Sequence, residues 1–181
     1  VTAVYTTRTA FLVVRSEANH AFVFGGGAAG TEPAGFANVN WATAQVWSNG
    51  QAFVVIWGTD QLCWGNPLYG GACPAGLATN LVSITPSVRA FVALKGATVQ
   101  CWGDQFTGAD CPTRDYTDMT IKATGYAFVA YPATGTGFCW GDTQYGGECP
   151  AGIDFTDTTV YGAMGAFVAV NTVAKTAVCW G

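Results

Sequence analysis

The chain has 181 residues, of which 50% are hydrophobic and only 10% charged, whereas about 25% of the residues in a typical soluble domain are charged. Eleven acidic residues against seven Lys and Arg give a net charge of −4, and the basic residues are scattered from Arg8 to Lys175, which excludes the concentrated basic surface of a nucleic-acid-binding protein. Apolar runs stay below the roughly 18 residues that a membrane-spanning helix needs, so no membrane span is expected.

The length suits a single domain, and a surface with so few charges favours a protein that associates with other molecules, carries glycans or sits inside an assembly. We take assembly as the leading interpretation. No cationic, apolar leader precedes Val1, so a secretion signal is expected either to have been removed or to lie outside this sequence.

A repeat of about 38 residues runs through the chain. Cys-Trp-Gly occurs at intervals of 38, 38 and 40 residues, starting at Cys63, Cys101, Cys139 and Cys179. A divergent first copy begins at Ala10-Phe11 and has Phe24-Gly25 in place of Trp-Gly. A fixed period of this size indicates stacked supersecondary units. We therefore predict one repeat domain of five units, approximately 1–38, 39–80, 81–117, 118–156 and 157–181, with the last one incomplete.

Each unit is expected to hold three short strands. The first strands are β-branched and apolar, at Val1 to Tyr5, Leu81 to Thr85, Thr120 to Ala123 and Thr159 to Tyr161. The second, for example Ala90 to Leu94, is apolar on both alternations, as in a strand buried on both faces. The third is represented by Thr98 to Trp102. With 24 glycines and no helical period, the fold is predicted to be all-β; the alternative is one short helix at Ala75 to Asn80.

Cysteines recur ten positions apart in three units, and the divergent first unit has Val23 and Glu32 where both would stand. Joint loss of both members is expected for the two halves of one bridge. We predict three disulfides, Cys63 with Cys73, Cys101 with Cys111 and Cys139 with Cys149, and hence a secreted, extracellular protein. Zinc is not expected, because nine residues separate the paired cysteines and His20 is the only histidine.

Cys179 has no such partner in the sequence. Three interpretations stay open, in order of preference: the array continues beyond Gly181, the thiol pairs with another molecule, or it is a buried reduced cysteine.

The repeat motif resembles that of the regulator of chromosome condensation superfamily. The matching residues are Ile84, Ala90 to Leu94, Gly96, Val99 and Trp102-Gly103-Asp104, and in the next unit Ile121, Ala127 to Ala130, Trp140-Gly141-Asp142 and Gly146-Gly147. The resemblance implies β-propeller blades around a central axis. Since the units are shorter than the roughly 50 residues of such blades, it implies a short variant with one outer strand reduced to the disulfide loop. A five-bladed, propeller-like ring and an open β-solenoid-like stack both fit five copies.

Aromatic residues recur on the third strand and the loop after it, and two further tryptophans lie in the irregular stretch from Gly25 to Gly50. Packing between units, with each indole covering its own disulfide, is the favoured role of the recurrent rings; stacking on sugars is the other. We expect the two further tryptophans to serve a contact between subunits. The candidate ligand or interface aromatics are Trp41, Trp47, Trp64, Tyr69, Trp102, Phe106, Trp140, Tyr145 and Trp180.

Catalytic residues are not predicted. His20 has no acid partner at a meaningful spacing, and Asp104 and Asp142 alternate with Asn66 and Gly26, which indicates turn capping. We predict a non-enzymatic, extracellular structural protein without cofactor or metal, a subunit of a polymer, filament or surface array. Its partners would be other copies of itself, neighbouring repeats of a longer chain, or glycans. The alternative is a lectin-like module, and Thr6, Thr7 and Thr9 are candidates for O-linked sugar.

Overall fold

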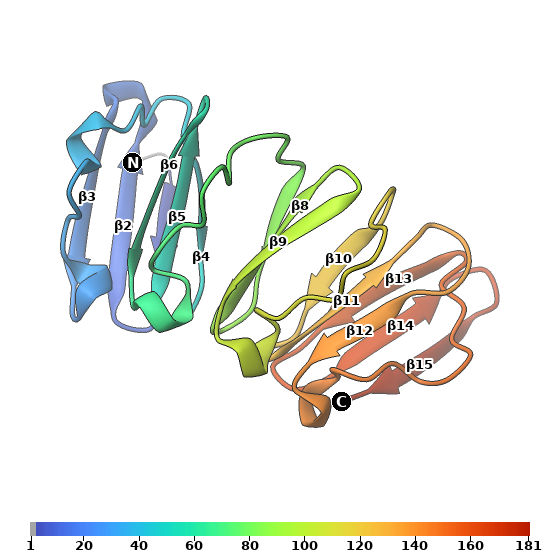
Figure 1. The fold of residues 1–181 in the computed structure, drawn as a ribbon. Coiled ribbons are helices and arrows are strands. Elements are labelled where there is room, and N and C mark those ends of the chain that lie inside the picture. The colour runs from blue at the N-terminus through green and yellow to red at the C-terminus, as the bar shows by residue number, and fades with distance from the viewer. Residues whose placement is uncertain (1–2) are drawn as a thin grey trace.

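The computed structural model describes residues 3–181 as five antiparallel sheets of three strands each, one per repeat unit (Figure 1). The all-β prediction with five tandem repeats is confirmed. In each sheet the strands follow one another in chain order, so every sheet is a meander. The strands of sheet 1 are β1 (Ala3–Thr6), β2 (Ala10–Arg15) and β3 (His20–Gly25); of sheet 2, β4 (Gln45–Ser48), β5 (Ala52–Trp57) and β6 (Asp60–Gly65); of sheet 3, β7 (Ser83–Pro86), β8 (Ala90–Lys95) and β9 (Thr98–Gly103); of sheet 4, β10 (Thr120–Ala123), β11 (Ala127–Tyr131) and β12 (Phe138–Gly141); and of sheet 5, β13 (Thr158–Gly162), β14 (Phe167–Asn171) and β15 (Thr176–Trp180).

The observed strands differ from the predicted ones at their ends. The strand expected at Leu81 to Thr85 begins at Ser83 and ends at Pro86. The strand expected from Val1 is described from Ala3 onward, because Val1 and Thr2 lie outside the described residues.

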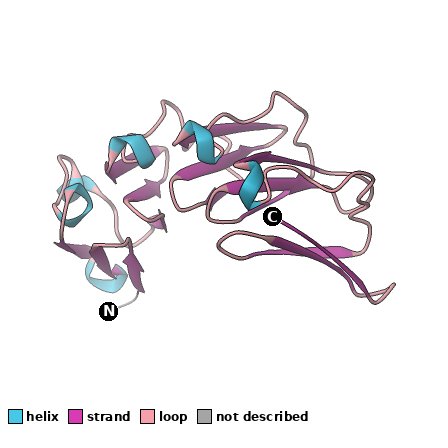
Figure 2. Ribbon diagram, turned by 90° about the horizontal axis from the view of Figure 1, so that it is seen from below, coloured by secondary structure: helices cyan, strands magenta, loops and turns pink. Residues whose placement is uncertain are grey.

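Helical structure among residues 3–181 is confined to short 3-10 turns, drawn in cyan in Figure 2. The helix considered at Ala75 to Asn80 is wrong: that segment forms turns. None of the helices described is long and apolar enough to cross a bilayer. The turns are η1 (Ser16–Ala18), η2 (Ala28–Gly30), η3 (Phe36–Asn38), η4 (Pro67–Tyr69), η5 (Gln105–Thr107) and η6 (Thr143–Tyr145).

The sheets succeed one another along an arc, with sheet 1 and sheet 5 at its two ends (Figure 1). Their first strands lie next to one another in the order β1, β4, β7, β10 and β13. Each sheet therefore turns one face toward the preceding sheet, which we call its leading face, and one toward the following sheet, its trailing face.

The core consists of apolar layers between consecutive sheets. Successive side chains of a strand point to opposite faces, so a strand in a middle sheet contributes to two layers. In β8, Phe91 and Ala93 pack toward sheet 2, whereas Ala90, Val92 and Leu94 pack toward sheet 4. All five side chains are buried. Burying a side chain such as Phe91 contributes about 1.5 to 3 kcal/mol, which explains why the second strand of each repeat is apolar on both alternations.

A ladder of backbone hydrogen bonds joins the turns between the first and second strands of all five sheets. The N–H of Arg8 donates to the carbonyl of Gly50 (2.9 Å), Gly50 to Val88 (3.0 Å), Val88 to Gly125 (2.9 Å) and Gly125 to Met164 (2.9 Å). The sheets approach each other closely here: a Cβ at Gly125 would lie 2.7 Å from the Met164 carbonyl oxygen. The ladder sets the spacing of the sheets at this edge.

Candidate functional site

The loops after the third strands of sheets 2, 3 and 4 share one local structure. Each begins with a side chain that accepts a hydrogen bond from a backbone N–H two residues later, which starts a 3-10 turn. The turn-capping role predicted for Asp104 and Asp142 is confirmed. The bonds run from Leu68 N–H to Asn66 (3.0 Å), from Phe106 N–H to Asp104 (3.0 Å) and from Gln144 N–H to Asp142 (2.9 Å).

A glycine in the left-handed region ends each of these turns and bonds to the next sheet. Gly70 has φ 99°, and a Cβ there would lie 2.5 Å from the Phe91 ring. Its carbonyl oxygen accepts a hydrogen bond from the indole N–H of Trp102 at 3.1 Å. The equivalent bonds run from Trp64 to Ala29 (3.0 Å), from Trp140 to Gly108 (3.0 Å) and from Trp180 to Gly146 (3.2 Å). The loop of each sheet is thus held by the tryptophan of the next one.

The structure has disulfides between Cys63 and Cys73, Cys101 and Cys111, and Cys139 and Cys149. The expectation that each indole covers its own disulfide is wrong. Cys63 and Trp64 are consecutive in β6 and therefore point to opposite faces. Cys63 and Cys73 pack against the cluster that contains Trp102 of the following sheet, whereas Trp64 packs toward sheet 1.

The tryptophans proposed as ligand or interface residues lie mostly inside the protein. The subunit-contact role expected of Trp41 is wrong, since it is 3% exposed and packs on Phe36 with ring centroids 4.9 Å apart. Trp47 is half-buried against the layer between sheets 2 and 3. Of the recurrent indoles, Trp64, Trp102 and Trp140 are buried and Trp180 is half-buried. Of the other named aromatics, Phe106 is exposed, and Tyr69 and Tyr145 are half-buried in the loops after the third strands.

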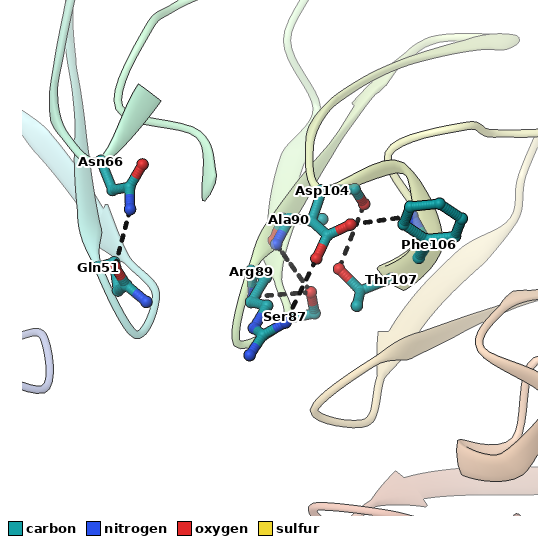
Figure 3. A network of polar contacts seen from close by, with 8 residues as sticks. All are labelled: Gln51, Asn66, Ser87, Arg89, Ala90, Asp104, Phe106 and Thr107. Atoms are coloured by element: carbon teal, nitrogen blue, oxygen red, sulfur yellow. Dashed lines mark hydrogen bonds and ion pairs between the residues drawn. The ribbon is translucent and has the colours of Figure 1, made fainter. Parts of the chain in front are cut away.

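These residues border a row of rings and one arginine along the loop edge. The Arg89 guanidinium lies 5.1 Å from the Tyr69 ring centre and 5.8 Å from that of Tyr126, within cation–π range. Tyr126 in turn contacts Tyr145, with centroids 4.7 Å apart. Arg89 also pairs with Asp104 at 3.6 Å, and Figure 3 shows this pair beside Phe106. The row links sheets 2, 3 and 4 across their loops.

Arg89 was not among the residues singled out from the sequence. A signal for it exists, because in sheets 2 and 3 the side chain before Ala-Phe pairs with the capping residue of the following loop. In sheet 2 that position holds Gln51, whose side chain accepts a hydrogen bond from Asn66 (3.0 Å), and in sheet 3 it holds Arg89 opposite Asp104 (Figure 3). The amide pair and the charged pair exchange together between repeats.

Shallow depressions lie between consecutive loops at this edge. One of about 310 Å³ is bordered by Leu68, Tyr69, Asp104 and Phe106. Phe106 is 85% exposed and Leu68 73% exposed, so exposed apolar side chains lie beside the polar side chains of Asp104 and Gln105. A second depression, of about 450 Å³, lies between sheets 1 and 2 and includes Gln51. The arrangement suits contact with an extended or flat partner.

In residues 3–181, the ionisable groups with a shifted pKa lie outside the two loop depressions. No group of three His, Cys, Asp or Glu side chains in this part of the chain could hold a metal ion. The His20 ring contacts the Phe22 ring at a tilt of 56°, with centroids 4.6 Å apart. Burial raises the pKa of Tyr116 to about 12, and hydrogen bonds from Thr117 lower the pKa of Asp115. Neither residue borders the loop depressions.

Cys179 lies on β15, is exposed, and forms no disulfide. Its neighbour Trp180 points toward sheet 4, so Cys179 stands on the trailing face of sheet 5. The interpretation as a buried reduced cysteine is therefore wrong.

Comparison with known proteins shows what the fold is similar to. No protein family model matches the chain, and no curated protein matches it. Solved structures do. The ectodomain of the receptor kinase CR4 from Physcomitrella patens is similar at a TM-score of 0.63 and 17% identity, covering 98% of this chain and 51% of that one. The CRINKLY WD40 ectodomain of the Arabidopsis thaliana receptor kinase ACR4 is similar at 0.62 and 17% identity, covering 98% and 67%.

This chain thus spans about half the length of the moss ectodomain and two thirds of the Arabidopsis one. At 17% identity the likeness shows the fold. It supports a β-propeller repeat fold, as the sequence resemblance implied, but it does not support the regulator of chromosome condensation type in particular.

Proposed function

We propose that this protein is a non-enzymatic, extracellular scaffold made of one domain of propeller-type repeats, which works by associating with protein surfaces, first of all with other copies of itself. The carrying observation is that sheets at both ends of the arc expose apolar side chains. Val4, Phe11, Phe22 and Phe24 of sheet 1 are 44% to 53% exposed. Contiguous exposed apolar surface marks an interaction site.

Comparison within the chain strengthens this assignment. Phe53, Phe91, Phe128 and Phe167 occupy in sheets 2 to 5 the place that Phe11 has in sheet 1, and all four are buried by a preceding sheet. Phe11 stacks on Phe24 at 5.4 Å much as Phe53 stacks on Trp64 at 4.9 Å. The exposed pair on sheet 1 is therefore built like a joint between two sheets.

An extracellular location is supported by the disulfides and by the origin of the similar structures. Three local bridges of this kind persist in oxidising compartments. Both similar structures are described as receptor kinase ectodomains, and we extend that location, but not their signalling role, to this chain as a proposal.

Sedimentation velocity of the purified chain, over a wide range of concentrations, tests self-association. We expect the mass per particle to rise above 18.8 kDa with concentration. A particle of monomer mass at every concentration would contradict the proposal. Intact-mass measurement before and after reduction, on the same sample, counts the disulfides and detects attached sugar.

A second function is favoured by the depression between Leu68 and Phe106. Exposed rings beside the polar groups of Asp104 and Gln105 could stack on and hydrogen-bond to a sugar, which is the lectin-like alternative. A glycan array tests it, with Phe106→Ala as the paired variant. Binding that Phe106→Ala abolishes would support the sugar site, and the absence of any bound glycan would remove it.

A further inference from the structure

The two end sheets expose opposite halves of one repeated joint. Strand alternation assigns Val4, Phe11, Val13, Phe22 and Phe24 to the leading face of sheet 1, and it assigns Tyr161, Val168, Val170 and Cys179 to the trailing face of sheet 5. Of these, Phe24 is 52% and Tyr161 59% exposed. Among residues 3–181, the apolar layers between sheets include none of these side chains.

Each joint inside the arc is made from the same two kinds of face. Between sheets 4 and 5, Val129 and Tyr131 on a trailing face pack with Val160, Phe167 and Ala169 on a leading face. The joints between sheets 2 and 3 and between sheets 3 and 4 repeat this pairing of positions. A trailing face is therefore the surface that a leading face of this protein fits.

The backbone ladder ends with complementary groups. Along the arc, the N–H of each turn donates to the carbonyl of the turn in the following sheet. At the two ends of the ladder, the Met164 N–H of sheet 5 and the Arg8 carbonyl of sheet 1 are the groups that continue this pattern. Residues 3–181 supply no backbone hydrogen-bond partner for either group. A donor at one end and an acceptor at the other suit a contact between copies in the same direction as the chain.

Phe24 simplifies this contact. In sheets 2 to 5 the corresponding tryptophan needs a loop carbonyl from the preceding sheet. The phenyl ring of Phe24 carries no hydrogen-bond donor. The leading face of sheet 1 can therefore pack against an apolar surface that offers no loop carbonyl.

We infer that a second copy of this chain covers the leading face of sheet 1 with the trailing face of its own sheet 5, head to tail, and that the Met164 N–H of one copy donates to the Arg8 carbonyl of the other. This inference rests on the proposed self-association and specifies its surfaces. Because the two surfaces differ, the contact is heterologous, and it generates either a closed ring of copies or a filament.

Two substitutions block the two faces separately. Phe24→Glu places a carboxylate on the leading face and Tyr161→Glu places one on the trailing face. Both residues are more than half exposed in the single chain, so the variants are expected to fold, which circular dichroism checks. Burying an unpaired charge in the contact should weaken association of either variant on the order of 100-fold or more. Val82→Glu, beside sheet 3 and 64% exposed, is the matched control and should associate like the unchanged chain.

Mixing the two blocked variants gives the decisive result. The intact trailing face of Phe24→Glu should bind the intact leading face of Tyr161→Glu, and the mixture should stop at a complex of two chains in sedimentation velocity. Self-association of Tyr161→Glu alone would show that two leading faces pair symmetrically and would overturn the inference. Unchanged association of both variants, in a protein that does associate, would overturn the inference but leave the proposed function standing. An unchanged chain that stays monomeric would contradict both.

Discussion

The indole nitrogen of Trp102 donates a hydrogen bond to the carbonyl oxygen of Gly70, 3.1 Å away, across the joint between sheets 3 and 2. The donor lies on a strand and the acceptor in a left-handed position at the end of a 3-10 turn. One bond therefore fixes both the loop and the sheet that follows it. The same pairing recurs at the other joints, and it makes stability testable joint by joint.

Trp102→Phe should lower the free energy of unfolding by about 1 to 3 kcal/mol, because it keeps a ring on Phe91 but leaves the buried Gly70 carbonyl without a donor. Denaturation in urea measures the change. Trp180→Phe is the matched variant and should lower the free energy of unfolding by less, since Trp180 is only half-buried. A Trp102→Phe protein as stable as the unchanged chain would mean that water replaces the indole donor.

Gly125→Ala should destabilise the protein by about 1 to 3 kcal/mol, because the added methyl would lie 2.7 Å from the Met164 carbonyl oxygen and 2.6 Å from its sulfur. Thermal unfolding measures the effect. Gly26→Ala is the control: its methyl would come no closer than 3.9 Å to the Thr9 atoms nearby. Equal melting temperatures for the two variants would contradict a close approach of the turns.

Replacing both Cys101 and Cys111 by serine should cost about 3 kcal/mol, the loop-entropy contribution of a bridge across a short loop. Cys179→Ser should leave the stability of the single chain unchanged, because that thiol is exposed and unbridged. Urea unfolding of both variants, with and without a reductant, separates the two cases. Under reducing conditions the double serine variant should be as stable as the unchanged chain, because neither then has this bridge. A difference in stability that persists in reductant would point to packing of the sulfur atoms instead.

Stability should fall as the pH rises from about 10 toward 12. Burial raises the pKa of Tyr116 from 10.0 to about 12, so the folded protein keeps this phenol protonated where the unfolded chain ionises it. The stability that the protonated Tyr116 phenol contributes is fully present below pH 10. It is lost as the pH rises toward the folded-state pKa of about 12.

Tyr116→Phe should therefore flatten the decline of stability between pH 10 and 12. At neutral pH the variant should lose about 1 kcal/mol, because the phenol donates a hydrogen bond to the Pro112 carbonyl at 2.9 Å. Urea titrations at a series of pH values test both effects, with the exposed Tyr161→Phe as reference. If the stability of Tyr116→Phe still fell as steeply between pH 10 and 12, the decline would be due to other tyrosines.

Local sequence patterns were enough to predict much of the fold. Turn residues and alternation act between neighbours in sequence, so the strand at Thr120 to Ala123 was predicted with its observed ends and Ala90 to Leu94 was predicted as buried on both faces. The capping role of Asp104 likewise depends on a bond spanning two residues. Interactions of this range are contained in the repeat itself.

Contacts between repeats could not be read in this way. The sequence by itself determined five all-β units, because period, alternation and turn chemistry are local properties of the chain. Only the tertiary structure decided that Trp64 serves the preceding sheet and Cys63 the following one, that Trp41 is buried, and that Arg89 joins two neighbouring loops. The physical reason is that adjacent residues of a strand face opposite ways, and what each of them meets depends on how the sheets stack.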